Sequence, residues 1–267
     1  MRSISWEELY SRSYVPYSGI NEACIIIGKS GTYYPGVRVE NVSFPLTVES
    51  VQSALFSCLS EGDAPVTLLL PEGGNPAQDS KSSGIDDAYP ERNILPQRAS
   101  FESHSISFWC ETFGLQCMSR ASLEKRARHI FFKTIEEQND VKRLAELTNR
   151  CIIPYSSFPV TALLVTDAGI FSGVNIEVPD WQKGLCAERT ALVKAISSGA
   201  NKLLEIHVYA PQSDYVSPCG ACRQVLLEHM SSGKILLHHN EFELSRLMVS
   251  DLLPYQFKAQ NLKRIKS

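Results

Sequence analysis

Apolar residues recur at helical spacing through the stretch GLCAERTALVKAISSG, residues 184–199. The positions that share this spacing are Ala187, Ala191, Leu192, Ala195 and Ile196. Gly199 follows the last of them, and glycine commonly ends a helix. The pattern therefore predicts a helix that begins near Cys186 and ends at Gly199.

Shorter apolar runs around this helix predict strands. The stretch TALLVTDAGIFSGVNIE, residues 161–177, has two apolar runs on either side of an Asp-Ala-Gly turn, which is typical of a β-hairpin. Residues 203–210 and residues 234–239 are two further strand candidates. Each run is short enough to be a strand and too short to be a membrane span.

A second helix is predicted at SPCGACRQVLLEHM, residues 217–230. Ser217 is the expected N-cap, and Pro218 is expected at the first helical position. From about residue 140 the order is helix, two strands, helix, strand, helix, strand. Helices that alternate with strands in this way favour a layered α/β domain.

The first half of the chain is divided from this domain by two changes of pattern. Residues 71–105 are rich in proline, glycine and serine, which predicts an irregular segment. The stretch SLEKRARHIFFKTIEEQNDVKRLAELTNRC then predicts a helix that breaks near its Asn-Asp pair. We therefore expect a first domain over 1–120, a linker helix over 121–139 and a second domain over 140–267.

An internal repeat links the two domains. Residues 14–44 and 152–181 share four features in the same order: Pro-Tyr-Ser, an apolar strand, a glycine turn, and Gly-Val-x-apolar-Glu. Chance does not easily produce all four in order. The repeat predicts two related domains.

Composition narrows the class of protein. The chain has 267 residues, a net charge of −3 and eight cysteines. The acidic balance does not fit a general nucleic-acid binder, and no apolar run is long enough to cross a bilayer. The first residues lack the apolar run of a signal peptide, and cysteines without secretory signals favour a reducing compartment. We expect a cytoplasmic protein.

Three cysteines lie at the starts of the two predicted helices. Cys219 and Cys222 form a C-x-x-C pair on a first turn, and Cys186 begins the other helix. Zinc accepts thiolates in tetrahedral geometry, and helix N-termini help to keep thiols ionised. One zinc ion at the point where the two helix starts meet would be bound by all three cysteine thiolates. Three protein ligands are typical of a catalytic site, because the fourth position stays open for water.

Glu188 lies two residues after the first cysteine and is the candidate proton carrier. Zinc lowers the pKa of a bound water to roughly 7, and a neighbouring carboxylate can take and deliver its proton. This combination, with Pro-Cys-x-x-Cys, is the arrangement of the zinc deaminases. Taken alone, the C-x-x-C pair could also be a redox pair or half of a structural zinc site.

The motifs CAERTA and PCGACRQ, in this order, resemble the cytidine deaminase family of the three-cysteine zinc type, over residues 140–258. The resemblance implies an α/β fold with two three-layer α/β/α domains. It also implies one zinc ion per chain, held in the C-terminal domain. Thr161, and the run from Val178 to Trp181, depart from the usual family residues, so the exact nucleoside preference stays open.

The resemblance also implies substrate-binding residues. YSSFPV assigns Phe158 to pack on the pyrimidine, NIE assigns Asn175 and Glu177 to the ribose, and CAERTA includes Ala187. LLPYQF assigns Phe257, which in the family reaches an active site across a subunit boundary. Each has a plainer alternative: core packing for the phenylalanines, and local turn hydrogen bonds for Asn175 and Glu177.

Arg189 follows Glu188 and is expected to face the thiolates. Three thiolates around Zn²⁺ leave a net negative charge, and a guanidinium that donates to sulfur would offset it. The alternative is a solvated helix residue.

The N-terminal domain resembles the same fold without the chemistry. When Glu40 is aligned with Glu177, Glu49, Ser50, Val51 and Gln52 stand where the Cys-Ala-Glu-Arg run stands. Valine cannot carry protons, and no P-C-x-x-C follows. We interpret this domain as degenerate and non-catalytic.

The expected reaction is zinc-dependent hydrolysis of cytidine or deoxycytidine to the uridine nucleoside and ammonia, as in pyrimidine salvage. The alternatives are deamination of another cytosine-containing compound, such as a nucleoside antibiotic, and a non-catalytic zinc-stabilised binding protein. Glu188 disfavours the latter, because a structural site has no use for it. The resemblance implies a homodimer that imitates a four-domain assembly, with a small nucleoside as substrate and no nucleic-acid or membrane partner.

Overall fold

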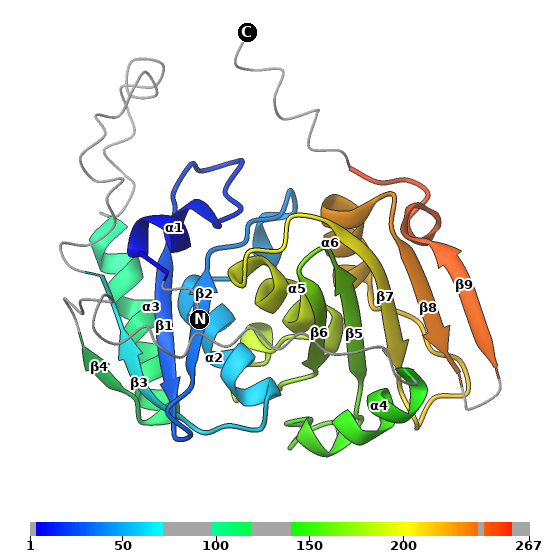
Figure 1. The fold of residues 1–267 in the computed structure, drawn as a ribbon, viewed down its shortest axis with the longest axis horizontal. Helices are drawn as coiled ribbons and strands as arrows, with labels where there is room; N and C mark the ends of the chain where they lie inside the picture. Colours follow the sequence, from blue (N-terminus) through cyan, green and yellow to red (C-terminus); the bar gives the residue numbers. More distant parts are fainter. Residues whose placement is uncertain (1–3, 72–97, 119–139, 240–242, 258–267) are drawn as a thin grey trace, which may run out of the picture.

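The computed structural model describes residues 4–71, 98–118, 140–239 and 243–257 (Figure 1). Its strands form two separate sheets, one in each half of the chain. The expected linker helix over 121–139 lies outside the described residues. No helix among the described residues is long and apolar enough to cross a bilayer.

Four strands of the described N-terminal half form a mixed sheet in the order β2-β1-β3-β4. β1 pairs antiparallel with β2 and β3, and β3 pairs parallel with β4. The strands are β1 Ala23–Gly28, β2 Tyr33–Val37, β3 Pro65–Leu69 and β4 Gln116–Met118. The helices are α1 Trp6–Ser11, α2 Ser50–Ser60 and α3 Arg98–Phe113, with a 3-10 turn η1 at Phe44–Leu46.

The C-terminal half repeats this order and adds one strand, giving β6-β5-β7-β8-β9. Only β7 and β8 are parallel; the other neighbours are antiparallel. The strands are β5 Thr161–Thr166, β6 Gly169–Val174, β7 Leu203–Tyr209, β8 Lys234–His238 and β9 Leu244–Met248. The helices are α4 Asp140–Leu147, α5 Ala187–Ser197 and α6 Gly220–Met230, with 3-10 turns η4 Thr148–Arg150, η5 Trp181–Lys183 and η6 Val249–Leu252.

Helices cover both faces of the C-terminal sheet. Thr161 Oγ1 donates a hydrogen bond to Leu144 O of α4 at 2.9 Å. The next strand residue, Ala162, points to the opposite face and pairs with Gly173. A Cβ at Gly173 would lie 2.1 Å from Ala187 O, so β6 and α5 meet directly there. The predicted three-layer α/β/α architecture is confirmed in this half.

The internal repeat is confirmed in three dimensions. Gly36 on β2 meets α2 as Gly173 meets α5: a Cβ there would lie 2.1 Å from Ser50 O. Glu49 is the N-cap of α2, and Cys186 is the N-cap of α5. The alignment of Glu40 with Glu177 predicts this correspondence between the two N-caps. The two halves therefore share the same arrangement of strands and central helix.

The two halves pack against each other through their equivalent helices. In Figure 1 the two sheets lie side by side with α2 and α5 between them, and these helices contact each other directly. Gln52 Nε2 on α2 donates to Lys183 O in the other half. α2 and α5 are therefore each buried on two sides, against the sheet of their own half and against the other half of the chain.

Two expectations about helix boundaries were wrong. The irregular segment predicted over 71–105 overlaps α3, which begins at Arg98. Ser217 does not cap α6: Cys219 is the N-cap, and the Ser217 hydroxyl accepts from Arg223 Nη2 at 2.7 Å. Arg223 Nε also donates to Pro218 O at 2.9 Å, so this side chain holds residues 217 and 218 outside the helix.

Candidate metal and catalytic site

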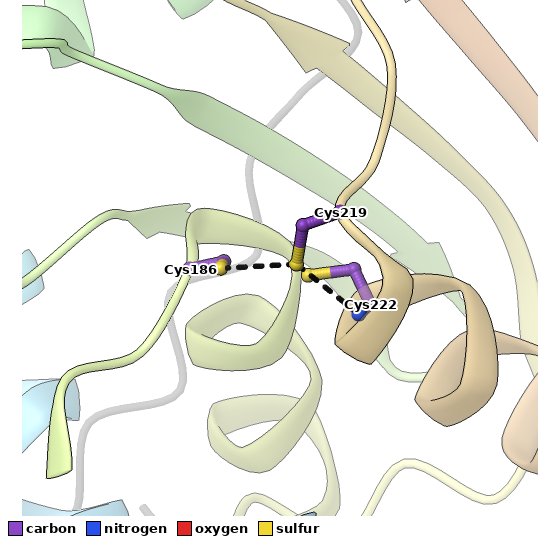
Figure 2. Close-up of side chains that lie close together, drawn as sticks. All are labelled: Cys186, Cys219 and Cys222. Atoms are coloured by element: carbon purple, nitrogen blue, oxygen red, sulfur yellow. Dashed lines mark hydrogen bonds between the residues drawn. The ribbon is translucent and has the colours of Figure 1, made fainter. Parts of the chain in front are cut away.

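The starts of α5 and α6 bring three sulfur atoms together (Figure 2). Cys186 and Cys219 are the two N-cap residues, and Cys222 lies in the first turn of α6. The Sγ atoms of Cys186 and Cys219 are 3.6 Å apart, and all three Sγ atoms lie within 4.8 Å of one another. The predicted convergence of two helix starts on one point is therefore present in the structure.

This donor set fits zinc. Thiolates at about 2.3 Å from a tetrahedral Zn²⁺ lie roughly 3.8 Å from one another, close to the observed separation. Among the described residues, no histidine or carboxylate joins the three cysteines in a common ligand group. A three-sulfur set leaves one tetrahedral position for a non-protein ligand, which is the pattern of catalytic zinc sites.

The three thiols interact closely with one another. Hydrogen bonds from Cys186 and Cys222 lower the pKa of Cys219 far below its usual range, and the same contacts raise the pKa values of the two donors. The backbone N–H of Cys222 also points at the Cys219 sulfur, at 3.5 Å. One thiolate is therefore stabilised at this helix start before any metal binds.

Glu188 is buried directly beside this cluster, in the first turn of α5. Glu188 is 2% exposed, and burial raises the pKa of its carboxyl to about 7. Oε2 has no hydrogen-bond partner within the protein. A carboxyl with a pKa near neutrality can both accept and release a proton, and an unpartnered oxygen is free to contact a ligand.

Both predicted ribose-binding residues hold the loop that precedes β5. The Glu177 carboxylate accepts from Tyr155 N at 3.0 Å, from Ser156 N at 3.1 Å and from Ser156 Oγ. Although burial opposes it, the bonds from Ser156 and Tyr155 keep the pKa of Glu177 below its usual range. Asn175 Oδ1 accepts from Val160 N at 2.9 Å.

The same loop carries Phe158. Asn175 Nδ2 donates to Phe158 O at 2.8 Å, and the ring is 37% exposed, so it is not a core residue. Ala187, the first residue of α5, is completely buried, and its backbone oxygen faces Gly173 of β6. Phe257 is 53% exposed and follows η6. The structure thus ties Asn175, Glu177 and Phe158 into one hydrogen-bonded unit, and Phe257 lies outside this unit.

Arg189 contacts the other half of the chain. Nη2 donates to Leu46 O at 3.0 Å, while Nε is buried without a hydrogen-bond partner within the protein. The alternative of a solvated helix residue is wrong, because the residue is 9% exposed. A bond from Nε to a thiolate stays a prediction.

Sequence reasoning missed the residues that shape the loop before Cys219. Arg223 holds Ser217 and Pro218, as described above, and its place in PCGACRQ was the available signal. His239, after β8, accepts from Val216 N at 3.0 Å. Nothing in the sequence pattern indicates this second contact, since it joins two segments 23 residues apart.

Comparison with known proteins agrees with this geometry. A family model described as the cytidine and deoxycytidylate deaminase zinc-binding region matches residues 135–237, which include the three cysteines and Glu188. Cytidine deaminase of Halalkalibacterium halodurans is 37% identical over 130 residues, which are 48% of this chain and 98% of that protein. Cytidine deaminase of Sporosarcina psychrophila is 41% identical over 112 residues, 41% of this chain and 82% of that protein.

Solved structures of similar proteins carry the same description. Cytidine deaminase from Burkholderia pseudomallei has a TM-score of 0.41 and 32% identity, covering 44% of this chain and 95% of that one. Cytidine deaminase from Mycobacterium tuberculosis has a TM-score of 0.37 and 30% identity, covering 45% of this chain and 99% of that one. Because relatives that are more than 30% identical are matched along most of their length, the chain belongs to the cytidine deaminase family.

Proposed function

We propose that this protein catalyses the hydrolytic deamination of cytidine or deoxycytidine to the uridine nucleoside and ammonia. The observation that supports it most is the buried Glu188 carboxyl, with one unpartnered oxygen, beside three sulfur atoms at two helix starts. The named relatives are cytidine deaminases, and the family model covers this site.

In this proposal Cys186, Cys219 and Cys222 hold one zinc ion per chain, in the C-terminal half. Zinc with an open coordination position makes a water molecule acidic near neutral pH. Three thiolates leave one excess negative charge, and the free Nε of Arg189 is available to offset it.

Glu188 moves the protons. Its carboxylate accepts a proton from the attacking water and delivers it to ring N3 of the cytosine. The water oxygen forms the new bond to C4, and the same carboxylate takes the second proton of that oxygen and delivers it to the amino group at C4. The bond from C4 to this amino nitrogen then breaks, the oxygen becomes the C4 carbonyl, and one water is consumed for each ammonia released. The raised pKa of Glu188 supports this role, because one group must accept and donate in the same cycle.

The substrate is held by the unit formed around the loop before β5. We infer that Phe158 packs on the pyrimidine, that Asn175 and Glu177 bind the ribose hydroxyls, and that Ala187 lines the pocket. The half-exposed Phe158 ring and its backbone bond to Asn175 support a shared pocket. Phe257, on the C-terminal segment, is assigned to the same pocket by its motif.

The N-terminal domain, residues 1–120, does no chemistry in this proposal, and the catalytic domain covers 140–267. Glu49 stands where Cys186 stands and Val51 where Glu188 stands, counted from the N-caps of α2 and α5. A valine cannot carry a proton, and a single carboxylate cannot replace three thiolates.

The proposal places the reaction in pyrimidine salvage, in the cytoplasm, with a homodimer as the assembly. All eight cysteines are free thiols, which fits a reducing compartment. Phe44 and Trp181, which occupy equivalent 3-10 turns of the two halves, are 84% and 62% exposed. Paired exposed aromatics of this kind fit a symmetric contact between two copies.

The test is a deamination assay with a zinc measurement on the same sample. Purified protein is incubated with cytidine or deoxycytidine, and loss of the cytosine absorbance band is followed. Glu188→Ala is expected to keep its zinc and to lose at least about 10²–10⁴-fold in turnover. Full turnover by this variant would overturn the assigned role of Glu188. Zinc-loaded wild type that leaves both nucleosides unchanged would overturn the proposed substrate.

A further inference from the structure

The helices that carry the three cysteines are both held by the N-terminal half. Cys186 is the N-cap of α5, and three residues of this helix, Arg189, Lys194 and Ser197, contact that half. Near its start, Arg189 Nη2 donates to Leu46 O. At its end, Ser197 O accepts from Arg12 Nη1 at 2.9 Å, and Ser197 Oγ accepts from Val37 N at 3.2 Å.

The central contact of α5 is a buried ion pair. Lys194 Nζ pairs with Glu61 of the N-terminal half, and the two side chains are 7% and 11% exposed. Nζ also lies 3.4 Å from Ser60 Oγ and 3.1 Å from Ser172 O on β6. A buried charge of this kind needs its partners, because an unpaired ammonium group in the interior is strongly unfavourable.

This ion pair is not a repeat of the pseudo-symmetric packing. Lys194 lies eight residues after the N-cap of α5, and the residue at the same place in α2 is Ser57. The Ser57 hydroxyl bonds within its own helix, to Ser53 O. The buried interdomain lysine is therefore found on the helix that carries Glu188, and it pairs with Glu61 at the C-cap of α2, which has no equivalent lysine.

α6, which carries Cys222, is held in a similar way. The Glu228 carboxylate reaches the N-terminal half and accepts three hydrogen bonds there: from Tyr14 OH at 3.0 Å, Tyr17 OH at 2.7 Å and Val42 N at 2.8 Å. The ring of His229 also packs on Tyr14, with 4.4 Å between centroids. α6 therefore ends in a charged, hydrogen-bonded contact with the degenerate half.

We propose that the N-terminal half positions the two helices that converge on the metal, with Lys194 on α5 and Glu228 on α6 as positioning residues. Lys194 and Glu228 lie towards the C-terminal ends of the two helices, so a tilt of either helix at these contacts displaces the cysteines at its other end. Three ligands on two separate helices keep their geometry only when both helices are fixed. This inference rests on the proposed zinc site.

Variants in the N-terminal half alone test the proposal, because they leave the sequence of the catalytic half intact. Glu61→Gln weakens the pair with Lys194, and Tyr17→Phe removes one bond to Glu228. Matched controls make the same kinds of substitution at contacts whose two partners both lie in the N-terminal half. They are Glu22→Gln, which loses the pair with Arg38, and Tyr34→Phe, which loses the bond to Asp63.

Zinc-loaded, full-length protein is mixed with an excess of a chromophoric chelator well below its unfolding temperature, and the rate of zinc transfer is measured. The combined variant Glu61→Gln/Tyr17→Phe is expected to release zinc about tenfold faster than wild type. We also expect a lower kcat with KM within about twofold, since Glu188 moves with α5. The controls are expected to release zinc at the wild-type rate.

Four results would contradict the proposals. The positioning role is overturned if the combined variant releases zinc at the wild-type rate. It is also overturned if controls that lose as much stability release zinc as fast as the combined variant. If the combined variant does not fold, Tyr17→Phe alone is compared with Tyr34→Phe, and equal release rates again overturn it. Wild type that binds no zinc contradicts the proposed metal site instead, so the two failures are distinguishable.

Discussion

Glu49 and Cys186 occupy the same structural position in the two halves of the chain, as the N-caps of α2 and α5. Cys186 faces Cys219 at 3.6 Å, whereas the Glu49 carboxylate accepts a hydrogen bond from Ser105 of α3. One half thus offers a cluster of thiols at this position, and the other offers a carboxylate that a hydroxyl already binds.

This difference predicts the zinc content. Wild type is expected to hold one zinc ion per chain, and Cys186→Ala to hold none, because two thiolates alone make a weak site. Cys58→Ala, which removes a buried cysteine of the N-terminal half, is the control and should keep its zinc. Metal analysis of dialysed protein gives the answer, and zinc retained by Cys186→Ala would point to a site elsewhere.

Glu177 and its counterpart Glu40 allow a matched test of substrate binding. Both carboxylates accept from two backbone N–H groups and one serine hydroxyl; for Glu40 these come from Tyr17 and Ser18. Glu177→Gln is expected to raise KM about tenfold, because it loosens the loop that carries Phe158 and removes the proposed ribose contact.

Glu40→Gln removes the same kind of loop contact in the degenerate half, and we expect no change in KM. Steady-state kinetics and a thermal unfolding curve for each variant separate binding from stability. An equal rise in KM for both variants would contradict the assignment of Glu177 to the substrate pocket.

Gly173 marks a close approach between β6 and α5. A Cβ at this position would lie 2.1 Å from Ala187 O and 2.5 Å from Ala191 N, so Gly173→Ala must displace the helix. We expect a loss of about 2–3 kcal/mol in the free energy of unfolding, and lower activity. Gly220→Ala, at the start of α6, meets no atom within 4 Å and should leave stability nearly unchanged. Denaturant unfolding of both variants checks the contrast.

His229 predicts how stability depends on pH. Burial lowers the pKa of this histidine to about 4, below its value of about 6.5 in an unfolded chain, although the charge of Glu228 opposes the shift. The folded protein therefore keeps His229 neutral, while the unfolded chain takes up a proton as the pH falls below about 6.5. Its contribution is fully present above that pH and is lost as the pH falls towards 4.

The loss from His229 alone is at most roughly 3 kcal/mol over this range. His229→Phe keeps a ring against Tyr14 and removes the titration, so its unfolding free energy should depend less on pH between 6.5 and 4. Urea unfolding at several pH values measures both slopes. Identical slopes for the variant and wild type would show that His229 is not buried in its neutral form.

The candidate site was largely predictable from sequence because its chemistry is local. The placement of Cys186, Cys219 and Cys222 at two helix starts and the neighbouring Glu188 follow from helix patterns and short spacings, although Ser217 rather than Cys219 was the expected N-cap of α6. The paired Gly-Val-x-apolar-Glu segments likewise predicted the two related halves. Such features depend on residues that are only a few positions apart, so the periodicity and spacing of the sequence are enough to predict them.

Contacts between distant segments were decided by the tertiary structure alone. Nothing in the helical spacing of residues 184–199 gives Lys194 a role, and only the packing of α2 against α5 brings it to Glu61. Glu228 reaches Tyr14 and Tyr17 across more than 200 residues of sequence. The sequence therefore determines which groups could do chemistry, through local spacing. Which groups hold the helices in place depends on burial and charge pairing between surfaces that meet only after the chain has folded.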